Sequence, residues 1–208
     1  MPADVAPPTI AVFARAPVAG EAKTRLIPAI GAEGAAALQR QLIERTLATA
    51  CAVPGARVTL WVAGPTGHPF IAAAATRFGV GLAVQDGADL GARMHHAFAA
   101  TAAPLVLIGT DCPQLTADDL AAAAAALADH DVVIQPASDG GYVLIALREA
   151  RPPLFESIDW GGPLVLQQTL DRIAALGLRL RLRPALDDLD TAEDLRRAVE
   201  AGLVAPTR

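Results

Sequence analysis

The sequence predicts an α/β fold built on a mostly parallel sheet, and three observations carry that prediction. Short apolar runs typical of buried strands alternate with longer segments that place apolar residues at helical spacing. Of the 208 residues, 53% are hydrophobic, which is enough for a sizeable core. No internal repeat, low-complexity linker or change in composition divides the chain. We therefore expect a single domain over residues 1–208, with helices on both faces of the sheet.

The first half of the chain alternates strands and helices. Apolar runs at 9–14 and 58–63 predict buried strands, and a weaker run at 80–84 predicts a third strand. Apolar residues at helical spacing predict a long helix at 32–50 and a short helix at 70–78. This alternation is typical of parallel strands joined by crossover helices.

The second half continues the alternation and adds one antiparallel strand. The run 104–108 predicts a buried strand, and Thr116 with Asp119 has the spacing of a helix-capping box. An Asp-Gly-Gly turn between two apolar runs predicts a small antiparallel insertion around 140–160. The alternating Leu-Arg run 178–183 predicts a half-exposed edge strand. The remaining predicted elements are a helix opened by 85–94, a helix at 116–129, strands at 131–136 and 142–147, and helices at 163–176 and after 191.

Composition and charge exclude several classes of partner. The net charge of −5 gives no basic surface for nucleic acid. No apolar stretch reaches the length of a membrane span, and residues 1–8 lack the basic and apolar regions of a signal peptide. Cys51 and Cys112 are far apart and show no metal-ligand spacing, so a reducing compartment is the default. We expect a cytoplasmic protein with no nucleic-acid or membrane partner.

Asp111 is the first candidate functional residue. It follows the run 104–108 directly and precedes Pro113, which prevents the strand from continuing. In open α/β sheets ligands bind outside the carboxyl ends of strands, where a carboxylate is well placed to hold a divalent metal. The alternative is an aspartate that only caps a turn, because Asp is a common turn residue.

The loop after the first strand is a candidate phosphate site. It contains Arg15, Gly20, Lys23 and Arg25 together with prolines, so its backbone N–H groups can point at an anion while the cations balance the charge. Lys23 is the only lysine among 17 basic residues, which hints at a need for a compact ammonium group at that position. The alternative is an exposed loop whose cations are solvated.

Two further clusters of residues follow predicted strands. In Asp139-Gly140-Gly141 the glycines allow a ligand to approach the backbone, and the carboxylate can accept hydrogen bonds from a hydroxyl group. The alternative is a plain hairpin turn. Asp190 belongs to a group of three carboxylates in four positions, which repel one another unless a cation relieves them. The alternative makes Asp190 part of the start of the last helix, because Thr191 has capping-box spacing.

Arg93 and Trp160 are weaker candidates for binding substrate. Arg93 lies in the first turn of a predicted helix, from which it could reach a ligand, although a surface arginine is the commoner case. Trp160 lies beside glycines and could form the wall of an acceptor pocket, although a core anchor is the commoner use of tryptophan.

Several motifs together, in this order, resemble a largely uncharacterised glycosyltransferase family of the GT-A, nucleotide-diphospho-sugar transferase fold. Some members of that family are assigned to arsenosugar biosynthesis. The resemblance extends from about Ile10 to Leu195. The motifs are Phe13-Ala-Arg-Ala-Pro, Gly20, Lys23-Thr-Arg25-Leu, Asp89-Leu-Gly91-x-Arg93-Met, Gly109-Thr-Asp111-Cys-Pro, Asp139-Gly-Gly-Tyr142 and Trp160-Gly.

This resemblance implies an enzyme that binds a nucleotide-sugar through Mg²⁺ or Mn²⁺ and transfers the sugar to a small-molecule acceptor. It implies that Asp111 is a metal carboxylate, and that Asp190 is the second one, as in related sugar nucleotidyltransferases. The absence of a second acid next to Asp111 departs from the usual Asp-x-Asp motif. Lys23 and Arg25 are expected to join Asp111 in catalysis, and a homodimer is one candidate assembly.

Two alternatives stay open. Ala22-Lys23-Thr-Arg-Leu26, Asp139-Gly-Gly141 and Asp188-x-Asp190-Thr191 also resemble the guanylyltransferases that activate phospholactate in deazaflavin cofactor synthesis. Such an enzyme releases pyrophosphate from a nucleoside triphosphate, whereas a glycosyl transfer releases a nucleoside diphosphate. Cys112-Pro-Gln-Leu115 and Tyr142 favour the glycosyltransferase-like family. A non-catalytic nucleotide-binding protein is the second alternative, because a fold does not guarantee chemistry.

Overall fold

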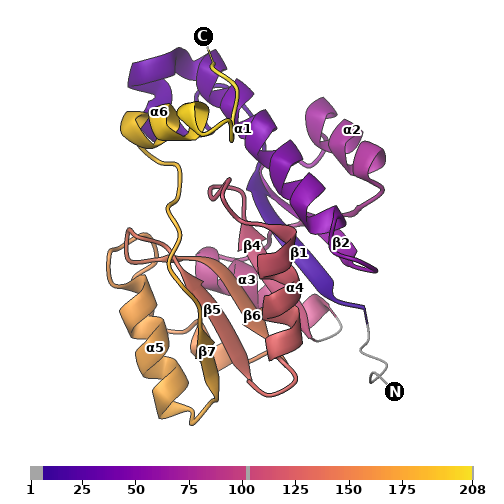
Figure 1. Cartoon of the computed structure of the whole chain (residues 1–208), viewed down its shortest axis with the longest axis vertical. Helices are drawn as coiled ribbons and strands as arrows, with labels where there is room; N and C mark the ends of the chain where they lie inside the picture. The colour runs from indigo at the N-terminus through magenta and orange to yellow at the C-terminus, as the bar shows by residue number, and fades with distance from the viewer. Residues whose placement is uncertain (1–6, 102–103, 208) are drawn as a thin grey trace.

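The computed structural model describes residues 7–101 and 104–207, and its helices and strands follow the predicted order (Figure 1). The expectation that residues 1–8 do not form a signal peptide concerns mainly residues 1–6, which lie outside the described residues. The strands are β1 Thr9–Arg15, β2 Arg57–Ala63, β3 Gly81–Val84, β4 Leu105–Gly109, β5 Val132–Pro136, β6 Tyr142–Leu147 and β7 Leu180–Leu182. The α-helices are α1 Ile27–Cys51, α2 Pro69–Phe78, α3 Leu90–Ala100, α4 Ala117–Ala126, α5 Val165–Ala175 and α6 Ala192–Glu200. Two short 3-10 helices are η1 Thr24–Leu26 and η2 Pro152–Leu154.

The strands form one seven-stranded sheet in the order β3-β2-β1-β4-β6-β5-β7. Pairing is parallel throughout except at β6, which is antiparallel to both β4 and β5. The predicted antiparallel insertion is therefore confirmed. The prediction that the Leu-Arg run forms an edge strand is also confirmed, since β7 is the last strand of the sheet.

Helices cover both faces of the sheet, as predicted. On one face α1, α2 and α4 pack on apolar side chains of β1, β2 and β4, such as Val12 and Leu60. On the other face α3 and α5 pack on the alternate side chains, such as Phe13 and Leu107. Because successive side chains of a strand point to opposite faces, a fully apolar strand such as β1 serves both cores. A third cluster joins α6 to the first part of α1, and Figure 1 shows α6 there, away from the sheet.

Element boundaries differ from the predictions at several ends. The first helix begins at Ile27 rather than near residue 32, and it contains a kink at Gly31, whose φ of 71° is not helical. The fourth helix is shorter than predicted because Thr116 is its N-cap and the residues after Ala126 form turns. The edge strand contains only Leu180–Leu182. No helix in the described ranges is both long enough and apolar enough to span a bilayer.

Candidate functional site

A cavity of about 770 Å³ opens at the carboxyl edge of the sheet. The strands β1, β4 and β5 run in the same direction, so the loops that follow them meet at this edge. Each loop contributes side chains to the cavity wall, and so does the segment between β7 and α6. The charged residues of the wall include Arg15, Arg25, Asp111, Asp139, Asp188 and Asp190.

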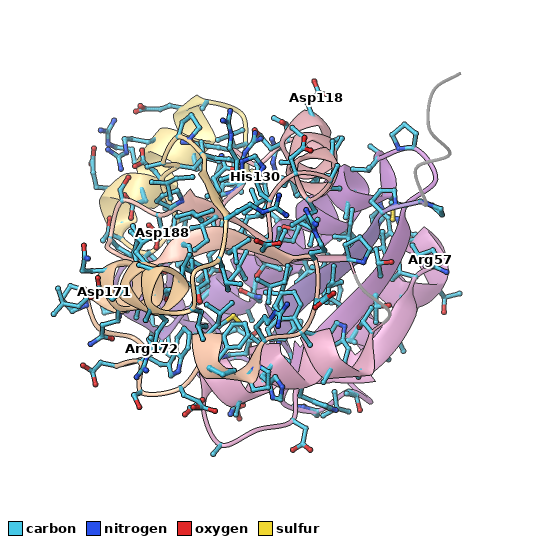
Figure 2. The ribbon with its side chains drawn as sticks, turned by 90° about the horizontal axis from the view of Figure 1, so that it is seen from below. Arg57, Asp118, His130, Asp171, Arg172 and Asp188 are labelled. Atoms are coloured by element: carbon cyan, nitrogen blue, oxygen red, sulfur yellow. The ribbon has the colours of Figure 1, made fainter. Side chains whose placement is uncertain are left out.

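Three of these carboxylates form a cluster. Asp139 follows β5, whereas Asp188 and Asp190 follow β7, and one carboxylate oxygen from each lies within 4.8 Å of the others. Figure 2 labels Asp188 on the left of the view, where the chain passes between α5 and α6. Partial burial, together with the nearby charges of Asp139 and Asp190, raises the pKa of Asp188 to about 6. The cluster therefore concentrates negative charge that a cation would relieve.

The chemistry of the cluster fits a hard divalent cation. Mg²⁺ and Mn²⁺ prefer carboxylate oxygens, and Asp139, Asp188 and Asp190 supply three of them in one place. The predicted metal residue Asp190 is a member of this cluster. The other one, Asp111, is not a member of the cluster, and its carboxylate lies 3.0 Å from the ammonium of Lys23. Asp111 is nevertheless half exposed and lines the same cavity.

Lys23 does not extend freely into the cavity. Its ammonium donates hydrogen bonds to the carbonyl oxygen of Leu189 at 2.5 Å and to Asp190 at 3.3 Å, in addition to the contact with Asp111. Its side chain is only 6% exposed. The structure thus places Lys23 among carboxylates and a backbone carbonyl.

Three arginines of the cavity wall are more available to a ligand. Arg25 is paired with Asp190 at 2.8 Å, but its side chain is 72% exposed. Arg15 and Arg93 form no ion pair with any described residue, and Arg93 uses only Nε, which donates to the carbonyl of Gly87 at 3.1 Å. Gly20, with a φ of 86°, shapes the loop before Lys23 and does not itself line the cavity.

The Asp139-Gly140-Gly141 turn joins β5 to β6, so it is a hairpin turn, and its Asp139 and Gly141 line the cavity whereas Gly140 does not. Asp139 accepts a hydrogen bond from the backbone N–H of Gly141 at 2.9 Å, which fixes the carboxylate over its own turn. The carbonyl of Gly140 accepts from the N–H of Leu166 at 2.8 Å. Since Leu166 lies in the first turn of α5, the turn is tied to the start of that helix.

Trp160 forms part of the cavity wall. Its indole lies against the backbone of Gly91 in α3 and packs near Phe155, with ring centroids 6.5 Å apart. Phe155 in turn stacks on Phe98 at 5.7 Å. Trp160 is therefore anchored in the second core, and it also borders the cavity.

Two residues of the site were missed at the sequence level. Asp188 enters the sequence analysis only through the guanylyltransferase-like motif, and the spacing of the acids at 187–190 does not distinguish it from Asp187, which accepts a hydrogen bond from Ser138 outside the cluster. Gln85 was also missed. Its amide nitrogen donates to the carbonyls of Ala14 and Trp61, which fixes it against the ends of β1 and β2 at the cavity wall. No sequence signal marks such a contact.

Solved structures share this fold. A candidate nucleotide-diphospho-sugar transferase from Desulfovibrio desulfuricans G20 is 30% identical, with a TM-score of 0.84 over 93% of this chain and 87% of that one. The 4-diphosphocytidyl-2C-methyl-D-erythritol synthase of Anaerococcus prevotii DSM 20548 is 12% identical, with a TM-score of 0.64 over 95% of this chain and 97% of that one.

Glucosyl-3-phosphoglycerate synthase from Mycobacterium tuberculosis, solved with Mn²⁺, UDP and glucosyl-3-phosphoglycerate, is 14% identical. Its TM-score is 0.56, over 94% of this chain and 77% of that one. The fold is therefore one that sugar transferases and nucleotidyltransferases share, and it is of the nucleotide-diphospho-sugar transferase type. No curated protein matches the sequence.

A family of bacterial proteins matches residues 46–162, which is more than half of the chain. This range contains β2 through β6 and the loop with Trp160, and so includes Asp111 and Asp139. Together with the 30% identity to a solved relative over most of both chains, the match settles the membership of the protein. The chain belongs to the family described as uncharacterized protein conserved in bacteria (DUF2064).

Proposed function

We propose that this protein is a metal-dependent transferase that moves a sugar from a nucleotide-diphospho-sugar to a small-molecule acceptor. The observation that carries the proposal is one cavity that joins three clustered carboxylates to exposed arginines. A diphosphate needs both a cation and hydrogen-bond donors to balance its charge, and this cavity offers places for both. The similarity to a candidate nucleotide-diphospho-sugar transferase supports a sugar donor.

In this proposal Asp139, Asp188 and Asp190 hold Mg²⁺ or Mn²⁺. When bound, such an ion neutralises charge on a diphosphate leaving group. Asp111, half exposed at the same cavity, is a candidate for a further oxygen ligand. The sheet builds this cluster, because β5 and β7 are neighbours and the loops that follow them carry its three carboxylates.

The arginines are the proposed donors to the phosphates. Arg25 is largely exposed, and Arg15 and Arg93 are free of ion pairs with the described residues, so each can turn its guanidinium toward an anion. A guanidinium binds phosphate oxygens through two parallel N–H groups, which fixes orientation as well as charge. Gly141 lines the same cavity and lets a ligand approach the backbone of its turn.

The wall that contains Trp160 is the proposed acceptor side. Leu90, Tyr142 and Val165 border the cavity there, giving it an apolar surface next to the charged half. An aromatic ring can pack against the apolar face of a sugar or of an acceptor, and the volume of about 770 Å³ lies within the range of small-molecule sites. Water is displaced from such a surface when the ring of a ligand covers it, which favours transfer over hydrolysis.

The test is to identify the leaving group. The protein is incubated with Mn²⁺ and a panel of nucleotide-sugars, and nucleoside diphosphate is measured with and without simple sugars, phosphoglycerate and phenols as acceptors. In parallel it is incubated with nucleoside triphosphates and phosphorylated acceptors, and pyrophosphate is measured. Asp188→Asn serves as the inactive control in both assays. We expect nucleoside diphosphate release that Asp188→Asn abolishes.

Pyrophosphate release, with no turnover of any nucleotide-sugar, would instead assign the cavity to nucleotidyl transfer. That alternative uses the same carboxylates and arginines, and solved cytidylyltransferases share the fold. Metal-dependent binding of nucleotides without either product would favour the non-catalytic alternative. The two product measurements therefore separate all three functions.

A further inference from the structure

The ammonium of Lys23, at the edge of the cavity, is surrounded by oxygen atoms of the protein. An ammonium group has three N–H donors and no acceptor, and three oxygen atoms lie within 3.3 Å of Nζ: the carbonyl of Leu189 and carboxylate oxygens of Asp111 and Asp190. The side chain is 6% exposed, whereas that of Arg25, two residues later, is 72% exposed. The two cations of one loop are therefore in different environments.

The partners of Lys23 belong to segments that also bind each other. Asp111 lies after β4, and its carbonyl accepts a 2.7 Å hydrogen bond from the N–H of Leu189. The carbonyl of Leu189 accepts only from Lys23 among the hydrogen bonds of the described residues. Leu189 is 1% exposed, and it stands between Asp188 and Asp190. Lys23 thus holds the peptide between two of the three clustered carboxylates.

The backbone of Lys23 also has an unusual conformation. Its φ of 47° and ψ of 44° are left-handed, and Ser157 is the only other non-glycine residue with positive φ among the described residues. Residues other than glycine rarely adopt this conformation, so the neighbours of Lys23 must hold it there. The bonds of Nζ to Leu189 and Asp190 are contacts that do so.

We propose that Lys23 is a positioning residue, which sets the segment 188–190 so that Asp188 and Asp190 can join Asp139, and that it does not bind the phosphates of the ligand. This inference rests on the proposed metal site. It assigns the phosphate contacts of the loop to Arg25, and it gives a reason for a lysine there: only a compact ammonium fits between the three oxygens.

The first test measures amide hydrogen exchange at Leu189 and Asp190, and it needs neither metal nor substrate. Lys23→Met removes the bond to the carbonyl of Leu189, so we expect exchange at these two amides to become at least about tenfold faster. Arg25→Met is the matched control, because it removes a positively charged partner of the same Asp190 but no contact with the backbone. We expect it to leave exchange within about twofold. Unchanged exchange in Lys23→Met would overturn the proposal.

The second test measures Mn²⁺ affinity by electron paramagnetic resonance without nucleotide. A positioning role predicts that Lys23→Met binds Mn²⁺ about tenfold more weakly, although simple removal of a positive charge near carboxylates would strengthen binding. Stronger Mn²⁺ binding by Lys23→Met would mean that Lys23 only competes with the ion for the carboxylates. Unchanged Mn²⁺ binding with weaker UDP binding would make it a phosphate ligand. Both results contradict the proposal.

Lys23→Arg covers the case in which Lys23→Met does not fold. Arginine keeps the charge, but its planar group cannot place one nitrogen among the three oxygens, so we expect the same faster exchange and weaker Mn²⁺ binding. Full rescue by arginine would show that charge alone matters and would overturn the proposal. If the wild-type protein binds no Mn²⁺, the proposed metal site fails, while the exchange measurement still decides the role of Lys23.

Discussion

The indole of Trp160 occupies the space that a side chain at position 91 would fill. A Cβ atom on Gly91 would lie 2.5 Å from Nε1 of Trp160 and within 2.7 Å of two ring carbons. Real Cβ atoms do not approach other heavy atoms this closely, so the tryptophan and a residue larger than glycine cannot both keep these positions. Gly91 therefore decides where the wall of the cavity stands.

Gly91→Ala should displace Trp160. Alanine at this buried position in α3 gains up to about 1 kcal/mol of helix propensity, but overpacking costs about 1–3 kcal/mol because the ring must move. We expect the Tm to fall by about 2–6 °C. In a Trp61→Phe background, where Trp160 is the only tryptophan, the fluorescence should shift to the red and acrylamide should quench it more strongly.

Gly67→Ala is the control for that prediction, because a Cβ there has no neighbour within 4 Å and the residue has no positive φ. Its Tm and fluorescence should match those of the parent protein. An unchanged spectrum in Gly91→Ala would mean that the helix, rather than the indole, gives way.

The hairpin that carries Asp139 should depend on Gly140. A Cβ there would overlap the backbone carbonyl of Pro163, and the φ of +93° is strained for other residues. Gly177→Ala is matched in conformation, with φ +63° but no atom near the new Cβ, so it should lower the Tm by about 2–4 °C. We expect Gly140→Ala to lower the Tm at least twice as far, and to weaken Mn²⁺ binding. Equal losses in the two variants would show that the loop relaxes around the clash.

The two cysteines should differ in reactivity. Cys51 is exposed, whereas Cys112 is buried beside Asp111, and burial raises the pKa of its thiol to about 11. Only the thiolate reacts, so at pH 8 a thiol reagent should modify Cys51 within minutes and Cys112 only after denaturation. Cys51→Ser should abolish the fast phase. A fast phase that persists in Cys51→Ser would show that the loop after β4 opens.

Most of the fold was predictable because the central strands are compact apolar runs and several helices have a side-chain cap at their start. Thr116 and Thr191 form capping boxes in the structure, as their spacing to an acid three residues later indicates. The start of α1 was not predictable in the same way. Pro28 and Gly31 suggest a loop, but the packed core lets a first turn form ahead of the kink.

The sequence could predict which loops meet at the site, but it could not predict the individual contacts between their side chains. Arg15 ends β1, and Asp111 and Asp139 follow β4 and β5. These three strands run in one direction, so the three residues share one edge of the sheet. The bond of Lys23 to the carbonyl of Leu189 joins residues 166 positions apart. Such a contact depends on the path of the last loop over the sheet, which no local pattern encodes.

The ion pair that joins the starts of β5 and β7 gives a prediction about pH. Asp131 accepts hydrogen bonds from the N–H and guanidinium of Arg179, and these lower the pKa of Asp131 from 3.8 to about 2. A lowered folded pKa means that the pair stabilises the folded state above pH 4 and that this stability is lost as the pH falls toward 2.

Asp131→Asn should therefore lower the Tm by about 1–3 °C at pH 7, and the difference from the parent should shrink steadily between pH 4 and pH 2. Asp86→Asn is the control, because Asp86 is exposed and has no ion pair among the described residues. A deficit that is the same at pH 7 and pH 2.5 would trace the loss to packing instead of charge. Scanning calorimetry across this range makes the comparison.

The sharpest test of the metal cluster compares two neighbouring acids. Asp188 belongs to the cluster, whereas the exposed Asp187 hydrogen-bonds to Ser138, so Asn at either position removes the same charge from the same segment. Asp188→Asn should weaken Mn²⁺ binding at least about tenfold because a ligand oxygen loses its charge, and Asp187→Asn should change it by less than about threefold. Asp111→Asn should fall between them, since Asp111 faces Lys23 at the edge of the site. Isothermal titration at pH 7.5 measures all three variants. Equal losses for the two neighbouring acids would mean that Mn²⁺ responds to the overall negative field of the cavity and that the cluster is no metal site.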